Sequence, residues 1–191
     1  GIGWSGGWGP SGSTNNSFEV INNSLSYPAA LEIGSTAGSV ANKTDGGIGH
    51  GRQLINGIKL NVSKFYVSFL AQKTSTGFFR IDDGDGPHVR FSVGVKADGK
   101  FEINAANQIL TSTESFFDND KTYLIVARWS YDTNADLKMV LFEEGEAIPE
   151  TDENLNWDFT DGDADGRTGV ILSQFRFAIS TGTVILDEFR L

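Results

Sequence analysis

The chain has 191 residues, a size that fits one domain, and its 39% hydrophobic and 12% aromatic content is sufficient for a folded core, which excludes a disordered tail. It has no cysteine and two histidines, so disulfides, thiolate chemistry and a three-histidine metal centre are excluded. The net charge of −10 excludes a basic face for nucleic acid or anionic lipid.

The chain begins with a glycine-rich segment that carries Trp4 and Trp8. Gly1 is not a start methionine and no signal-peptide pattern precedes it, so we expect a mature form or a segment of a longer protein. An aromatic residue among glycines can cap a β-sandwich or stand exposed as a platform on which a sugar stacks. Both interpretations of Trp4 and Trp8 stay open.

From residue 64 onward, apolar and polar residues alternate with the period of two that indicates β-strands. Because residues two apart share one face of a strand, we expect one set of alternating residues to lie in the core. The expected strands are 64–71, 77–81, 89–95, 100–103, 122–129, 137–142, 173–179 and 183–191. The expected core residues are Phe65, Val67, Phe69, Tyr123, Ile125, Trp129, Phe175 and Phe177.

The segments between these strands have turn chemistry. Asp98-Gly99 between two alternating runs is a strong hairpin signal, and 82–87 and 131–136 are rich in Asp, Gly and Asn. A short helix is expected at most near 104–110, and no longer window has helical periodicity. Regularly spaced strands without helices predict an all-β fold, a two-sheet antiparallel β-sandwich or jelly roll.

The segment from Glu143 to Asp165 contains ten acidic residues and no basic residue, so it accounts for the whole net charge. Within it, Asp161, Asp163 and Asp165 alternate with small residues in a sequence that we expect to be a loop. Calcium takes six to eight oxygen ligands, and such a turn can supply several of them. A calcium-braced loop and a solvated acidic turn are both consistent with this pattern. The acidic residues of 82–85 are more simply a hairpin turn.

Trp157 stands next to Asp158 and the acidic loop, and of the four tryptophans we expect it to be the best exposed candidate. The sequence therefore indicates Trp4, Trp8 and Trp157 as ligand-binding residues.

No catalytic constellation is evident. Gly3–Gly7 matches the G-x-S-x-G pattern, but the strand and helix that flank such a nucleophile elbow are not expected here. Two carboxylates that cleave a glycoside must face one cleft about 5 to 10 Å apart. One strand can arrange them as Glu-x-Asp-x-x-Glu, and Glu150-Thr-Asp152 comes nearest, but Leu155 replaces the last Glu. We therefore expect no enzymatic activity.

Four segments, namely 3–8, 66–70, 123–129 and 186–191, together resemble the laminin-G-like, concanavalin A-like jelly-roll domains of secreted bacterial proteins. The resemblance implies a single domain over 1–191, an extracellular setting and binding of carbohydrate or protein without catalysis. In many relatives an acidic residue of the last strand helps to hold calcium, and the matching residue here is Asp187. Because relatives usually have a strand before the Gly-Trp motif, the resemblance also predicts that this strand is missing or supplied by another chain.

We therefore expect a non-catalytic, lectin-like domain of a secreted or cell-surface protein, with a polysaccharide or glycan as its partner and structural calcium as its cofactor. Neither nucleic acid nor membrane insertion is expected. One alternative is a structural or adhesive subunit of a surface assembly, self-associating through strand edges or binding another surface protein. The other is a polysaccharide hydrolase or lyase of the same fold, which lacks support from the motifs.

Overall fold

The structure, a computed structural model, describes residues 4–10, 18–21, 39–42, 48–59, 64–74, 76–82, 91–105, 108–131, 135–149, 151–164, 171–181 and 183–190. The longest helix within these ranges is the three-residue 3-10 helix η1 (Asp152–Asn154). No described helix is long and apolar enough to cross a membrane.

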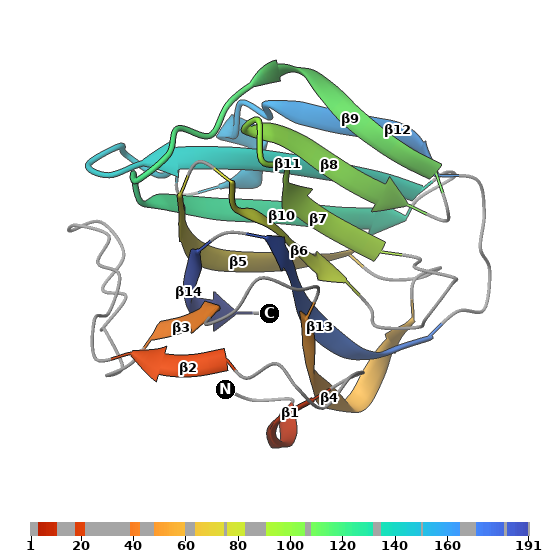
Figure 1. The fold of residues 1–191 in the computed structure, drawn as a ribbon. Helices are drawn as coiled ribbons and strands as arrows, with labels where there is room; N and C mark the ends of the chain where they lie inside the picture. Colours follow the sequence, from red (N-terminus) through yellow and green to blue (C-terminus); the bar gives the residue numbers. More distant parts are fainter. Residues whose placement is uncertain are drawn as a thin grey trace.

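The described residues form two seven-stranded sheets that stack face to face (Figure 1). The strands are β1 (Trp4–Pro10), β2 (Phe18–Ile21), β3 (Ser39–Asn42), β4 (Ile48–Lys59), β5 (Lys64–Lys73), β6 (Phe78–Asp82), β7 (Phe91–Val95), β8 (Lys100–Ala105), β9 (Gln108–Ser115), β10 (Tyr123–Tyr131), β11 (Ala135–Glu143), β12 (Phe159–Ala164), β13 (Ile171–Thr181) and β14 (Val184–Arg190). The first sheet has the order β1-β4-β13-β6-β7-β8-β9, and the second has the order β12-β11-β10-β5-β14-β3-β2. Every pairing is antiparallel, which confirms the predicted sandwich.

All eight predicted strands are present, with small differences at their ends. The predicted hairpin between β7 and β8 is confirmed: the Gly99 amide donates to the Lys96 carbonyl at 2.9 Å, and Gly99 adopts a φ of 78°. The short helix considered near 104–110 is wrong, because β8 continues to Ala105 and β9 begins at Gln108. The sequence of β9 lacks the alternation that indicates a half-buried strand, because β9 lies at the end of its sheet and exposes both Ile109 and Leu110.

The core lies between the two sheets and is rich in aromatic residues. All eight predicted core residues are buried, which confirms the predicted inward face of β5, β10 and β13. Phe91 of β7 meets Phe175 of β13 edge to face, with ring centroids 5.7 Å apart, and both rings pack around Phe65 of the opposite sheet. Such edge-to-face contacts add specific attraction to the burial of large apolar area.

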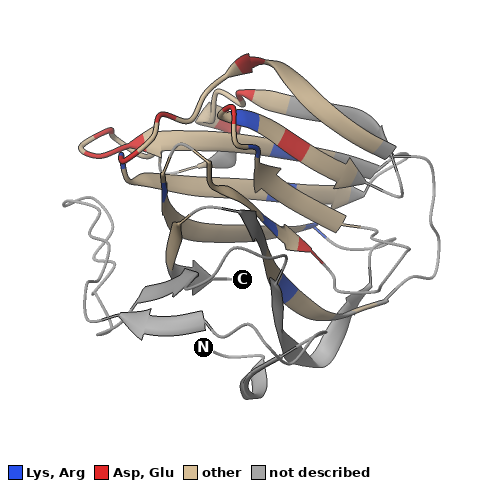
Figure 2. Cartoon of the chain, in the orientation of Figure 1, with Lys and Arg blue, Asp and Glu red and all other residues tan. Residues whose placement is uncertain are grey.

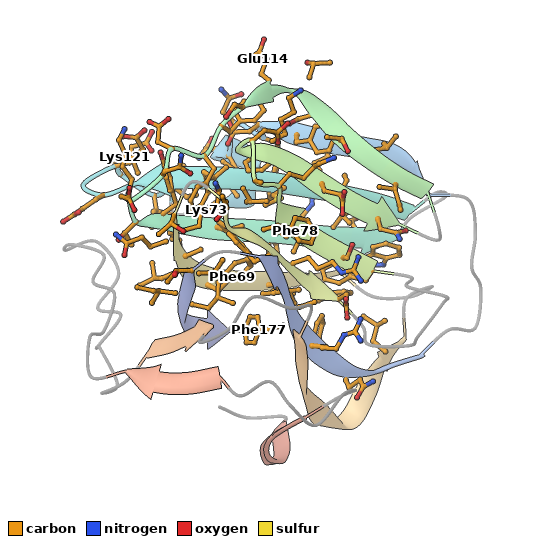
Figure 3. All side chains as sticks on the ribbon, viewed as in Figure 1. Phe69, Lys73, Phe78, Glu114, Lys121 and Phe177 are labelled. Atoms are coloured by element: carbon orange, nitrogen blue, oxygen red, sulfur yellow. The ribbon has the colours of Figure 1, made fainter. Side chains whose placement is uncertain are left out.

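A lysine closes one end of the core. Lys73, the last residue of β5, follows the buried residues Phe69 and Ala71 on the inward face and is 1% exposed (Figure 3). Its Nζ donates to the Ala97 carbonyl at 3.1 Å and to Asn119 Oδ1 at 2.7 Å, and burial lowers the pKa of the amine. Because Ala97 belongs to the β7–β8 turn of the first sheet, Lys73 links the two sheets.

The second sheet also buries apolar residues on its outer face. Leu70, Leu124, Val140 and Phe142 form a cluster there, and Ile148, Leu155 and Trp157 from the segment after β11 pack against it. This cluster explains why Leu70 is buried although it points away from the main core, as the alternation of β5 predicts.

Candidate functional site

A pocket of about 520 Å³ lies at one end of the second sheet. Phe116, Tyr123 and Leu141 supply its apolar walls, and Glu143, Glu144, Glu146 and Asp158 supply carboxylates. Figure 2 shows acidic positions in red along the loops at this end of the sandwich. We call this site the acidic pocket.

A tight turn after β11 brings three glutamates to the acidic pocket. The Glu146 amide donates to the Glu143 carbonyl at 3.0 Å, and the Glu143 amide donates to Glu146 Oε2 at 2.7 Å. Gly145 adopts a φ of 87°, a left-handed conformation that a residue with a side chain adopts only at a cost. The side chain of Glu144 is exposed.

Asp158 approaches the acidic pocket from the segment before β12. Its Oδ2 accepts a hydrogen bond of 2.9 Å from the Leu141 amide on β11. Partial burial of the carboxylate raises the pKa of Asp158, and the charge of Glu146 raises it further, while the Leu141 hydrogen bond lowers it. The charged form of Asp158 is therefore disfavoured here relative to water.

The aromatic wall is held by neighbouring polar groups. Tyr123 is 1% exposed, and its hydroxyl oxygen accepts a hydrogen bond of 3.2 Å from the Asp118 amide. Burial is the main cause of a raised pKa at Tyr123, so the phenol stays neutral at physiological pH. At the rim, Lys121 Nζ lies 2.8 Å from Asp118 Oδ2 and 3.5 Å from Glu143 Oε1, and the hydrogen bond to Asp118 is the main cause of its raised pKa.

Trp157, the predicted ligand-binding tryptophan whose side chain is described, is not among the described residues that line the acidic pocket. Trp157 is partly buried in the outer cluster of the second sheet, and the guanidinium carbon of Arg128 lies 5.1 Å from its ring centroid. Trp157 is therefore partly exposed, whereas Trp129 is buried, and its rank against Trp4 and Trp8 stays a prediction. Trp4 and Trp8 lie in β1, where Trp4 pairs with Leu54, but their side chains are outside the described residues.

The predicted calcium ligands are only partly described. Asp161 and Asp163 belong to β12, so the loop expected at this point is in part a strand that pairs with β11. Asp187 lies in β14 and pairs with Leu70. The side chains of these three residues, and the whole of Asp165, are outside the described residues, so the calcium site stays a prediction. Where side chains are described, no three His, Asp or Glu residues are grouped so that they could hold a metal ion.

The sequence reasoning missed the acidic pocket. Two sequence features indicate this pocket. One is the run Glu143-Glu-Gly-Glu146, which forms the turn, and the other is the pair of consecutive aromatic residues Phe116 and Phe117. Asp82 was also misplaced, because it is the last residue of β6 and fully buried instead of part of an exposed turn.

No protein-family description and no curated protein match the sequence. Among solved structures, the chain is similar to the carbohydrate binding module CBM66 from Bacillus subtilis, with 12% identity, a TM-score of 0.54 and coverage of 96% of this chain and 93% of that one. It is also similar to the globular domain of T. cruzi calreticulin, with 10% identity, a TM-score of 0.57 and coverage of 95% and 82%. A third similar structure is a carbohydrate esterase from the Shiga toxin-encoding bacteriophage phi24B, with 14% identity, a TM-score of 0.52 and coverage of 96% and 88%.

These similarities establish the fold: the chain is a concanavalin A-like jelly roll. The similar structures include binding modules and one esterase, so this fold is compatible with both kinds of activity.

Proposed function

We propose that the chain is a non-catalytic carbohydrate-binding domain of an extracellular protein, and that the acidic pocket binds the sugar. The observation that carries the proposal is the combination of carboxylates and aromatic walls in one pocket. Ionised carboxylates accept strong hydrogen bonds from hydroxyl groups, and aromatic walls such as Phe116 pack against the apolar face of a sugar ring. The similarity to a carbohydrate binding module supports the same function.

The charge of the acidic pocket selects the class of sugar. Four carboxylates stand around the cavity, and Lys121, which contacts Glu143 of the pocket, is also engaged by Asp118. An anionic polysaccharide would be repelled at this site, whereas a neutral or amino sugar would not. The proposed ligand is therefore a neutral or positively charged glycan.

The test is a glycan array followed by calorimetry with the best ligand. Glu144→Gln is the variant of choice, because Glu144 lines the acidic pocket and its side chain is exposed. Glu114→Gln is the matched control: it removes the same charge from an exposed position on β9, which is labelled apart from Lys121 in Figure 3. We expect Glu144→Gln to weaken binding and Glu114→Gln to leave it unchanged. Equal affinities for the two variants would place the sugar elsewhere.

A second candidate function is a structural or adhesive subunit that self-associates through a strand edge. Strand β9 ends the first sheet in the order of the described strands, and Ile109 and Leu110 on it are 61% and 38% exposed. An apolar edge strand is a template for pairing with another chain. Sedimentation of the purified chain tests this function: a dimer that Ile109→Lys converts to a monomer would favour it over glycan binding.

Calcium binding by Asp161, Asp163 and Asp165, with Asp187 as a further or separate ligand, remains part of the proposal. Oxygen ligands from alternate aspartates suit this ion. Secretion of the protein and a role in adhesion are likewise proposals.

A further inference from the structure

One aromatic residue of the acidic pocket is held flat against the core. Phe116, in the segment between β9 and β10, is partly exposed and lines the pocket. Its ring stacks on the fully buried ring of Phe101, with ring centroids 4.9 Å apart and an interplanar angle of 11°. Because Phe101 covers one face of this ring, the part of Phe116 that lines the pocket is its other face or its edge.

The backbone around Phe116 fixes the position of the ring as well. The amides of Phe116 and Phe117 both donate to the Gly99 carbonyl at 3.1 Å, which ties this segment to the β7–β8 turn. Phe117 is buried against Tyr123, with ring centroids 4.4 Å apart. A ring that is already held in place loses little freedom when a ligand packs on it. Phe116 is therefore a preformed surface for the apolar face of a sugar ring.

Two carboxylates of the acidic pocket are available to a ligand. Asp158 Oδ2 accepts from the Leu141 amide, and Asp158 makes no other hydrogen bond and no ion pair among the described residues. Glu144 makes neither kind of contact in the same part of the chain, and its side chain is exposed. Glu143 differs from these two, because Lys121 Nζ lies 3.5 Å from its Oε1. A positively charged ligand would therefore meet two carboxylates that no cation of the described chain neutralises.

The surroundings of Asp158 favour a cation over an uncharged group. Burial is the main cause of its raised pKa, and the charge of Glu146 adds to the effect. The carboxylate has lost part of its hydration and stands near a second negative charge. An ammonium group beside it would replace the lost water and also offset the repulsion from Glu146, whereas a sugar hydroxyl would do only the first.

Building on the proposed function, we infer that the acidic pocket takes an amino sugar, whose ring stacks on Phe116 and whose ammonium group lies against Asp158 and Glu144. The aromatic surface selects a ring and the two carboxylates select a cation. A neutral sugar meets only the first requirement, and a linear ammonium compound meets only the second.

Three disaccharides with the same linkage and ring stereochemistry separate these requirements. Next to the anomeric carbon, cellobiose has hydroxyl groups, the disaccharide of glucosamine has amines, and its N-acetylated form has neutral amides. Calorimetry on the full chain at pH 6, where the amines are protonated, measures the three affinities. We expect the glucosamine disaccharide to bind at least about tenfold more tightly than either neutral sugar. Ethanolamine, an ammonium compound without a ring, should also bind at least about tenfold more weakly than the glucosamine disaccharide.

Asp158→Asn tests the contact with the ammonium group. The variant keeps an acceptor for the Leu141 amide and removes the charge. It should lower the affinity for the glucosamine disaccharide by about tenfold and change that for cellobiose by less than about twofold. Glu153→Gln is the control, because Glu153 is an exposed acid of the same segment and is not among the described residues that line the pocket. It should change both affinities by less than about twofold.

Phe116→Leu tests the aromatic surface. The variant keeps an apolar side chain against Phe101 and removes the flat ring, so it should weaken the glucosamine disaccharide and cellobiose alike, by about threefold or more. Phe78→Leu is the matched control: it makes the same change at a partly buried position of β6 that is not among the described residues lining the pocket. It should leave both affinities unchanged.

The outcomes distinguish the amino sugar from the wider proposed function. Equal affinities for the three disaccharides would overturn the amino-sugar inference and leave sugar binding by the pocket intact. Equal binding of ethanolamine would overturn it too, because the pocket would then be a site for cations in general. If none of the disaccharides bound, the inference would be wrong and the glycan array would decide the proposed function. Unchanged affinity for the glucosamine disaccharide in both Asp158→Asn and Phe116→Leu would place the sugar elsewhere.

Discussion

Asp82 and Arg176 are 94 residues apart in the sequence and form a bidentate ion pair across β6 and β13, with both hydrogen bonds at 2.8 Å. The carboxylate is fully buried, whereas the Arg176 side chain remains 18% exposed. A buried charge is tolerated only when its partners replace the lost water, and here the guanidiniums of Arg176 and Arg80 do so. The pair therefore fixes the positions of β6 and β13 relative to each other.

Replacement of Asp82 tests this role. Asp82→Asn removes the charge that both arginines contact and leaves their guanidiniums less well satisfied. We expect a loss of about 2 kcal/mol in the free energy of unfolding, less than for a fully buried pair because Arg80 and Arg176 keep some contact with water. Urea unfolding at neutral pH measures it, with an unchanged m-value. An unchanged midpoint would show that the pair is energetically neutral.

The inner face of β13 stabilises the fold by burying an aromatic side chain in the core. Phe175 is fully buried, and its ring lies 5.7 Å from Phe91 and 6.4 Å from Phe65. Phe175→Ala should cost about 3 to 5 kcal/mol, because it removes the ring and leaves a cavity between the sheets. Ile109→Ala, at a 61% exposed position of β9, is the control and should stay within about 0.5 kcal/mol. Similar losses for the two variants would contradict the proposed core.

The core could be predicted from sequence because alternation reports directly which residues share a face. Phe65, Val67 and Phe69 alternate with less buried residues along β5, and the pattern alone places them inside. Asp82 could not be predicted in the same way. A buried carboxylate is recognisable only when its partner is known, and Arg176 becomes its neighbour through a pairing of distant strands.

The acidic pocket could not be predicted from the sequence either, because its residues come from separate segments of the chain. The run of acids was evident, but Asp158 reaches the pocket by a hydrogen bond to Leu141, and Phe116 reaches it from a segment between β9 and β10. Only the folded arrangement combines these segments. Trp157 has a contact that its sequence neighbours did not indicate, because it packs against an apolar cluster on the outer sheet face.

Two glycines should respond to alanine for different reasons. Gly94→Ala should cost about 1 to 3 kcal/mol, because the new Cβ would lie 2.5 Å from the Phe79 carbonyl oxygen. Gly145→Ala meets no atom within 4 Å, and its cost of about 1 kcal/mol comes from the φ of 87° alone. Thermal unfolding of both variants measures the difference. A larger loss at Gly145 than at Gly94 would contradict the close packing described for Gly94.

Calcium should stabilise the chain if the predicted aspartates bind it. An ion that binds only the folded state adds about 2.7 kcal/mol when its concentration is a hundred times its dissociation constant. The melting temperature should then rise with calcium and fall with a chelator, and Asp163→Ala should abolish the difference. Glu153→Ala, at an exposed position of the same acidic segment, should preserve it. A melting temperature that ignores both calcium and chelator would rule out the site.

The pH dependence of stability should reveal Asp158. Its pKa in the folded state is raised mainly by burial, so between the ordinary value of 3.8 and the raised value the folded chain binds more protons than the unfolded chain. The contribution of this group to stability is therefore full below pH 3.8 and is lost as the pH rises through the raised pKa.

Asp158→Asn keeps an oxygen acceptor for the Leu141 amide and removes the charge. The variant should gain stability relative to the native chain at pH 7 and lose that advantage near pH 4, as measured by thermal unfolding at both values. Glu153→Gln changes the same charge at an exposed position and should show a smaller difference between the two pH values. If Asp158→Asn exceeded the native chain in stability by the same amount at pH 7 and near pH 4, the pocket would not desolvate the Asp158 carboxylate.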